Sequence, residues 1–151
     1  MALLKVGDRL PDFECLDQHG VTINSSDLIG KKCVIFFYPK ASTPGCTVQA
    51  CNLSENFSLL TDYGFTIYGV SADKVKSQLS FSNKHGGFPY SLLADTDKKI
   101  INSFGVWGLK KFMGREYEGI NRTTFVTNID GVITKVINKV KTKDHTSQII
   151  E

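Results

Sequence analysis

Cys46 is the residue best suited to carry out a chemical reaction. It lies just after an apolar run ends and a pattern typical of a helix begins. Thr43 is a favoured N-cap residue type and Pro44 suits the first helical position, so Cys46 falls in the first turn of the predicted helix. Unpaired N–H groups and the positive end of the helix dipole favour a thiolate there. Because the thiolate is the nucleophilic form of cysteine, the position predicts a reactive thiol.

Ionisation of the thiol is one of two requirements for fast attack on a peroxide bond. Free cysteine is about 3% ionised at pH 7, so full ionisation gains about 30-fold in nucleophile, or roughly 2 kcal/mol of barrier. Charge also moves along the O–O bond as it breaks, and hydrogen-bond donors must stabilise it. The Thr43 hydroxyl, the first-turn backbone amides and a fixed arginine are suitable donors.

Arg122 is the arginine best placed to supply such a donor. It directly precedes Thr123–Thr127, a run typical of a buried strand and therefore a rigid base for a side chain. A guanidinium beside a thiolate stabilises the ionised sulfur and offers two parallel N–H bonds to two oxygens. The other arginines, Arg9 and Arg115, fit less well. We predict that Arg122 reaches Cys46 from far along the chain.

Cys51 follows Cys46 on the same predicted helix. Five residues of a regular helix leave two side chains ~140° apart, with their Cα atoms roughly 8–9 Å apart. That separation is beyond the range of a disulfide. A bond between the two sulfurs therefore requires the helix to unwind locally, and oxidation is expected to be coupled to that unwinding.

The remaining two cysteines, Cys15 and Cys33, are interpreted as small buried hydrophobic residues. A zinc site is not indicated, because the cysteines lack CxxC spacing and the histidines, His19, His85 and His145, are scattered. We expect no metal and no other cofactor.

Periodicity and turn residues predict an α/β fold with a central mixed sheet flanked by helices. Residues 8–30 read as an N-terminal β-hairpin with a turn at His19-Gly20, and Asp130-Gly131 is a second hairpin signal. A final segment, Asp144 to Ile150, reads as a terminal helical turn or a frayed tail. The other predicted strands are Cys33–Tyr38, Phe65–Val70, Ser91–Ala94, Thr123–Thr127 and Val132–Val136. The predicted helices are Gly45–Asp62, with Val48, Cys51, Leu59 and Leu60 as core contacts, Lys74–Lys84, with Val75 and Leu79 facing the core, and Asp97–Phe104.

Length and composition suit one globular domain over residues 1–151, with 151 residues and 41% hydrophobic content. The net charge of +3 is small, and the lysines near the C-terminus read as a solvated edge rather than a nucleic-acid surface. No apolar run is long enough for a membrane span, and the N-terminus lacks a signal-peptide pattern. We therefore expect a cytoplasmic protein with no membrane or nucleic-acid partner.

Several segments together resemble the peroxiredoxin family, in its bacterioferritin-comigratory-protein or peroxiredoxin Q branch. The Thr-x-x-Cys loop with its distant arginine is specific to the family, and a cysteine at the fifth position beyond the first marks the branch. The matching segments are Val6-Gly7-Asp8, Pro11-Asp12-Phe13, Thr43-Pro44-Gly45-Cys46-Thr47 with Cys51, Gly69-Val70-Ser71, Val106-Trp107-Gly108 and Gly119-Ile120-Asn121-Arg122-Thr123-Thr124-Phe125.

The resemblance implies a thioredoxin-like fold and an antioxidant peroxidase for hydrogen peroxide and organic hydroperoxides. By it, Cys46 is the peroxidatic cysteine, which passes through a sulfenic acid, and Thr43 and Arg122 bind and polarise the peroxide. Pro44 shields the pocket, and Gly45 is assigned with it to substrate binding. Cys51 is implied to be the resolving cysteine, in an intramolecular disulfide that thioredoxin reduces. A monomer without cofactor is implied.

The chain departs from the family pattern at Leu109, where an acidic residue is frequent, and in a short C-terminal helix. Cys15 and Cys33 are additional thiols that could compete as the resolving partner. Two other functions stay open at this point. One is a thiol–disulfide oxidoreductase, which typically uses CxxC. The other is a non-catalytic redox-responsive binding or holdase protein, which would consume about one peroxide per Cys46.

Overall fold

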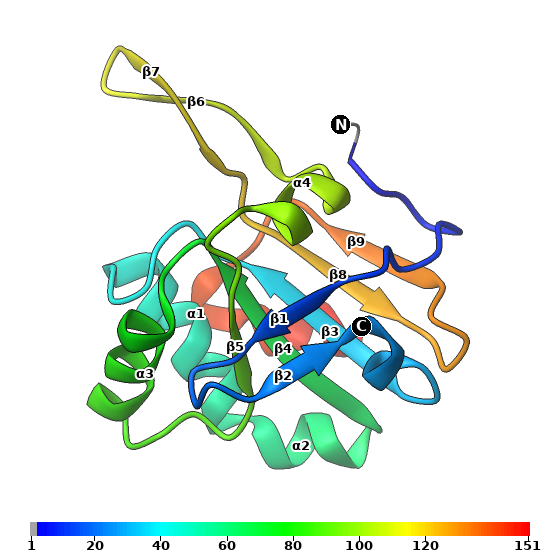
Figure 1. Ribbon diagram of the computed structural model, residues 1–151. Coiled ribbons are helices and arrows are strands. Elements are labelled where there is room, and N and C mark those ends of the chain that lie inside the picture. Colours follow the sequence, from blue (N-terminus) through cyan, green and yellow to red (C-terminus); the bar gives the residue numbers. More distant parts are fainter. Residues whose placement is uncertain (1–2) are drawn as a thin grey trace.

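A five-stranded mixed sheet forms the centre of the computed structural model, which describes residues 3–151 (for Phe112, the backbone alone). The strand order is β5-β4-β3-β8-β9, and β3 pairs in parallel with β4 and antiparallel with β8 (Figure 1). The strands are β3 (Lys32–Phe37), β4 (Phe65–Ser71), β5 (Ser91–Ala94), β8 (Thr123–Thr127) and β9 (Ile133–Ile137). The predicted sheet, including the β8–β9 hairpin, is confirmed.

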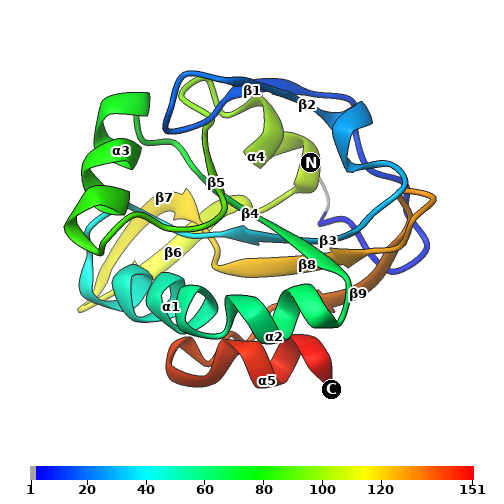
Figure 2. The same ribbon diagram turned by 90° about the horizontal axis from the view of Figure 1, so that it is seen from below.

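Helices cover one face of this sheet, and a helix with a hairpin covers the other (Figure 2). The first face carries α1 (Pro44–Glu55), α2 (Phe57–Asp62) and α5 (His145–Ile150). The second carries α4 (Lys99–Phe104) and the antiparallel pair β1 (Glu14–Leu16) and β2 (Thr22–Asn24). Helix α3 (Val75–Lys84) lies beside the edge strand β5, and two short 3-10 turns, η1 (Ser25–Leu28) and η2 (Thr142–Asp144), complete the elements. The N-terminal hairpin and the C-terminal helix are therefore both formed.

Alternation along the central strand β3 divides the core into two clusters. Val34 and Phe36 point into a cluster beneath α1, whereas Cys33, Ile35 and Phe37 point into a cluster beneath α4. All five side chains are at most 2% exposed. A strand with both faces buried reads as a continuous apolar run, which explains why this strand was recognisable in the sequence.

The predicted long helix is two helices, α1 and α2, that meet at Asn56. The buried positions of α1 are Cys46, Gln49, Ala50 and Leu53, which follow the spacing of one helical face. The prediction that Val48 and Leu59 face the core was wrong, since they are 38% and 40% exposed. Leu60 is fully buried, as predicted. In α3 the most buried residues are Gln78, Phe81 and Ser82, whereas Val75 and Leu79 are half-buried.

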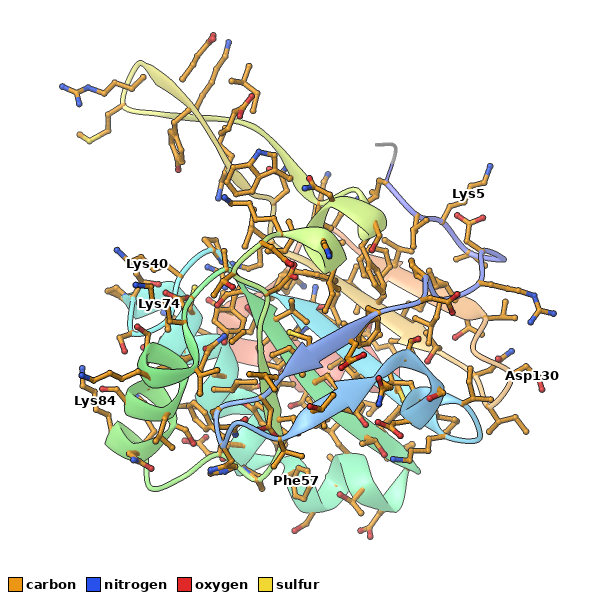
Figure 3. The ribbon with its side chains drawn as sticks, viewed as in Figure 1. Lys5, Lys40, Phe57, Lys74, Lys84 and Asp130 are labelled. Atoms are coloured by element: carbon orange, nitrogen blue, oxygen red, sulfur yellow. The ribbon has the colours of Figure 1, made fainter. Side chains whose placement is uncertain are left out.

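A third antiparallel hairpin, absent from the sequence predictions, projects from the body of the molecule (Figure 1). It consists of β6 (Trp107–Phe112) and β7 (Arg115–Ile120). Met113 and Gly114 connect them with φ values of 51° and 79°, as a tight two-residue turn requires. The outer part of the hairpin projects into the solvent (Figure 3), where Leu109, Lys111 and Arg115–Glu118 are exposed. It therefore lacks the apolar alternation by which a half-buried strand is recognised.

Within residues 3–151, no helix is both long enough and apolar enough to cross a membrane.

Candidate active site

Cys46 lies in the first turn of α1, at its predicted place, and its residue is 1% exposed. The backbone of Thr43 is extended, as at an N-cap, and its carbonyl accepts the Thr47 N–H at 2.8 Å. Pro44 begins the helix, where its missing N–H costs nothing. The Thr43 side chain differs from the expected cap: its hydroxyl donates to the Lys40 carbonyl at 2.8 Å and makes no capping bond. It therefore braces the loop that leads into α1.

Arg122 reaches Cys46 across 76 residues of sequence, as predicted. Its Nη2 donates to the Cys46 Sγ at 3.3 Å, and its Nη1 donates to the Gln49 Oε1 at 2.6 Å. A Cβ atom placed on Gly45 would lie 3.3 Å from the same Nη2, so a glycine lets the guanidinium lie close against the helix start. One arginine is thus bound to the sulfur and to the helix that carries it.

Gln49 is the site residue that sequence reasoning missed. It is fully buried in α1, one turn beyond Cys46, and its side-chain oxygen fixes one arm of the Arg122 guanidinium. Its Nε2 is also buried and has no hydrogen-bond partner among the described residues. A polar residue three positions beyond a helix-start cysteine, on the same helical face, is the signal that could have identified it.

Replacing Gln49 with leucine is expected to lower kcat/KM about tenfold in the peroxidase reaction that the motifs imply, because the Arg122 Nη1 then loses its acceptor and the guanidinium turns away from the sulfur. Steady-state kinetics would measure this loss. Val48→Ala, at the neighbouring exposed position of α1, is the matched control and should keep the wild-type value. Unchanged kcat/KM in Gln49→Leu would show that Arg122 needs no such partner.

Cys51 lies on the same unbroken helix and is half-buried, and both it and Cys46 are free thiols. Burial raises the pKa of the Cys51 thiol, and the nearby Glu55 raises it further. Cys51 therefore remains protonated at neutral pH while α1 is folded. The unwinding that a Cys46–Cys51 bond requires has not taken place in this form.

The other two cysteines belong to the opposite face of the sheet. Cys33 is fully buried in the cluster beneath α4, and Cys15 packs against that cluster, whereas Cys46 and Cys51 pack beneath α1. Burial raises the pKa of Cys33 to about 11. The predicted burial is confirmed for Cys33, whereas Cys15 is half-buried. The sheet thus separates both thiols from Cys46.

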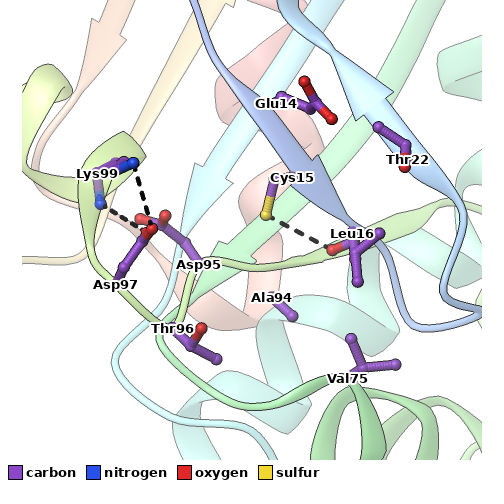
Figure 4. Close-up of a pocket in the computed structure, with 10 residues that line it drawn as sticks. All are labelled: Glu14, Cys15, Leu16, Thr22, Val75, Ala94, Asp95, Thr96, Asp97 and Lys99. Carbon is purple, nitrogen blue, oxygen red and sulfur yellow. Dashed lines mark hydrogen bonds and ion pairs between the residues drawn. The ribbon is translucent and has the colours of Figure 1, made fainter.

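Cys15 lines a pocket of about 440 Å³ together with Asp95 and Asp97 (Figure 4). Burial, followed by the negative charge of Asp95 and then of Asp97, raises the pKa of Cys15 to about 12. This thiol is protonated at neutral pH and thus a weak nucleophile. Within residues 3–151, no group of three or more His, Cys, Asp or Glu side chains is arranged to hold a metal ion.

The sequence model of the AhpC/TSA family matches residues 6–136. The chain belongs to this family of peroxiredoxins. The putative peroxiredoxin Bcp of Haemophilus influenzae is 45% identical to it over 98% of this chain and 95% of the relative. Peroxiredoxin Bcp of Escherichia coli is 43% identical over 94% and 90%, respectively. These relatives place this peroxiredoxin in the bacterioferritin-comigratory-protein branch, as the motifs indicated.

Solved structures agree on both branch and fold. This peroxiredoxin superimposes on the Xanthomonas campestris bacterioferritin comigratory protein with a TM-score of 0.87 and 31% identity, over 99% of this chain and 95% of that one. Peroxidoxin BcpB of Mycobacterium tuberculosis superimposes with a TM-score of 0.83 and 33% identity, over 96% of this chain and 93% of that one. The thioredoxin-like fold is confirmed. The protein is therefore a thiol-dependent peroxidase, an oxidoreductase with a peroxide substrate and a thiol reductant.

Proposed function

We propose that Cys46 is the peroxidatic cysteine of this enzyme and that Arg122 activates both the sulfur and the peroxide. The observation that carries this proposal is the 3.3 Å contact between the Arg122 Nη2 and the Cys46 Sγ at the start of α1. The thiolate attacks one peroxide oxygen, so that an S–O bond forms while the O–O bond breaks. The leaving oxygen takes up a proton and departs as water or an alcohol, and Cys46 becomes a sulfenic acid.

The loop before the helix forms the rest of the proposed substrate site. Pro44 shields the sulfur from bulk water, and Gly45 leaves space beside the guanidinium, where the peroxide oxygens bind. Thr43 holds the loop through the bond that its hydroxyl donates to the Lys40 carbonyl, and in the proposed complex the hydroxyl exchanges that carbonyl for a peroxide oxygen. Hydrogen-bond donors at fixed positions stabilise charge in a bond-breaking step without having to reorganise.

We infer that organic hydroperoxides are substrates as well as hydrogen peroxide. A mainly apolar pocket of about 390 Å³ lies between the loop that leads to α1 and the β6–β7 hairpin. Its lining includes Pro39, Lys40, Trp107, Lys110 and Ile120. Ile120 is two residues before Arg122, and the Lys40 carbonyl accepts the hydrogen bond of the Thr43 hydroxyl, so the pocket is lined by the two segments that carry the proposed site. The Xanthomonas campestris relative is described by its alkyl peroxide reduction activity, which supports this inference.

Cys51 is the proposed resolving cysteine, which forms a disulfide with Cys46. Thioredoxin or a similar dithiol protein is the proposed reductant of that disulfide. Cys51 is on the same helix and the same face of the sheet as Cys46, whereas Cys15 and Cys33 are on the other. We further propose that the chain acts as a monomer of one domain, residues 1–151, in the cytoplasm.

Cys51→Ser tests the resolving assignment. The variant should oxidise at Cys46 as fast as the wild type but stop at the sulfenic acid, which further peroxide converts to sulfinic acid. Mass spectrometry of the peroxide-treated protein would detect both species and any disulfide. Cys15→Ser is the matched control and should form the same disulfide as the wild type. Normal turnover of Cys51→Ser with thioredoxin would refute the assignment.

A further inference from the structure

Cys51 is flanked by two residues that other elements hold in place. The Ala50 carbonyl accepts a hydrogen bond of 2.7 Å from the buried Tyr90 hydroxyl, which comes from the residue before β5. On the other side, the Asn52 side chain bonds to the C-terminal segment of the chain. The backbone on either side of Cys51 is therefore tethered from outside α1.

The tether at Asn52 caps a different helix. Its Oδ1 accepts the Thr146 N–H at 2.9 Å and the Thr146 hydroxyl at 2.8 Å, while its Nδ2 donates to the Lys143 carbonyl at 3.1 Å. Thr146 is in the first turn of α5, where N–H groups have no partner within their own helix. The N-cap residue Asp144 makes no side-chain capping bond. A capping bond of this kind stabilises a helix by ~1 kcal/mol.

Helix α5 is in turn fixed to the sheet. The fully buried His145 ring contacts the Thr124 hydroxyl of β8 through Nε2 at 2.8 Å. The Lys135 ammonium of β9 donates to the Gln148, Ile149 and Glu151 carbonyls at 3.2, 3.2 and 2.6 Å. Asn52 is therefore bonded to an element that is itself bound to two strands.

The first turns of α1 are held differently. Their buried polar side chains, Cys46 and Gln49, both bond to Arg122, and helix ends open more easily than helix centres. Oxidation replaces a thiolate with a neutral sulfenic acid. The charge-assisted contact between Cys46 and Arg122 is then weakened, while the contacts of Ala50 and Asn52 are unchanged.

We propose that the tethers at Ala50 and Asn52 keep Cys51 stationary, so that the start of α1 unwinds and carries the oxidised Cys46 to it. Asn52 is then a positioning residue of the resolving step, an inference that rests on the proposed Cys46–Cys51 disulfide. In that step the Cys51 sulfur bonds to the Cys46 sulfur, and the S–O bond breaks. The leaving hydroxyl takes the Cys51 proton and departs as water. A stationary thiol raises the effective concentration of the attacking group.

Asn52→Ala and Tyr90→Phe each remove one tether and leave the Cys46–Arg122 contact in place. Both should keep the wild-type rate of Cys46 oxidation in quenched-flow experiments and slow disulfide formation, by about tenfold in the double variant. Sulfinic acid on Cys46 should rise accordingly. Asn52→Asp, which keeps the acceptor for Thr146, should recover part of the rate. Ser147→Ala is the control, because that hydroxyl bonds to Asp144 of its own segment.

Hydrogen exchange on the wild-type protein gives an independent test. On oxidation the Thr47 amide, bonded to the Thr43 carbonyl, should lose protection, while the Thr146 amide keeps it. Loss of protection at Thr146, faster disulfide formation in the variants, or an equal fall in both steps would overturn the proposal. Peptide mapping of the disulfide distinguishes failure of the proposed function from failure of this inference alone. Absence of the Cys46–Cys51 bond would refute the proposed function and this inference, whereas its formation at an unchanged rate in both variants would refute this inference alone.

Discussion

Replacing Cys46 with serine is expected to lower kcat/KM for hydrogen peroxide by more than about 10³-fold, leaving no measurable turnover. Serine has nearly the same shape, but its hydroxyl stays protonated at neutral pH and is a far weaker nucleophile. The Arg122 Nη2 donates a hydrogen bond to the Cys46 sulfur at the start of α1, where the attack on peroxide is proposed to take place. A coupled assay with excess thioredoxin and its reductase would measure the loss.

The shape of the protein should survive this substitution, which makes the result interpretable. The residue is 1% exposed and packs beneath α1, so near-ultraviolet circular dichroism of Cys46→Ser should match the wild type. Cys33→Ser, in the opposite cluster, is a control for loss of a buried thiol as such and should retain peroxidase activity in its folded fraction. Wild-type activity in Cys46→Ser would assign the chemistry to another cysteine.

Replacing Arg122 with methionine is expected to lower kcat/KM by about 10²–10³-fold, the usual cost of losing a donor aimed at developing charge. The two arms of the guanidinium bond to Cys46 and Gln49 at the same time. Lysine keeps the charge but is a single point donor, so Arg122→Lys should recover little of the loss. Rates of single-turnover Cys46 oxidation would show the effect on the first step directly.

The matched control for this prediction is Arg115→Met, in the projecting β6–β7 hairpin. It removes the same charge and should change kcat/KM little. If Arg122→Met retains full activity, or if Arg115→Met loses as much, the guanidinium near Cys46 has no special role. A loss in both arginine variants that disappears at high salt would instead indicate long-range attraction of charged substrates.

The central strands and the start of α1 could be predicted because the residue types within each segment indicate its structure without knowledge of tertiary contacts. The β3 run from Cys33 to Phe37 and the β8 run from Thr123 to Thr127 are buried throughout, and both were recognisable as strands. The start of α1 was recognisable from Thr43 and Pro44, which act at the backbone regardless of tertiary contacts.

Features that depend on tertiary contacts could not be predicted in the same way. The β6–β7 hairpin carries lysine and glutamate on exposed strands, so no buried face marks it. From its residue type alone, Gln49 would be taken for a solvent-facing helical residue. Its burial is explained only by the hydrogen bond that it accepts from Arg122 in the folded chain. The contact of Arg122 with Cys46 was inferred from chemistry rather than spacing, and only the fold shows that β8 delivers it.

The alternation of side chains along β3 affects which thiols of the chain can react with an oxidised Cys46. Neighbouring residues of this strand face opposite halves of the interior. Cys33 packs beneath α4, in the cluster that Cys15 also contacts, whereas Cys46 and Cys51, the proposed peroxidatic and resolving cysteines, pack on the other side of the sheet. An electrophilic sulfur forms in every catalytic cycle, and three other thiols in one molecule would otherwise invite scrambled bonds. Cys33 faces away from α1 on β3 and Cys15 comes from β1 on that same side, so the sheet lies between these two thiols and the proposed sulfenic acid of Cys46.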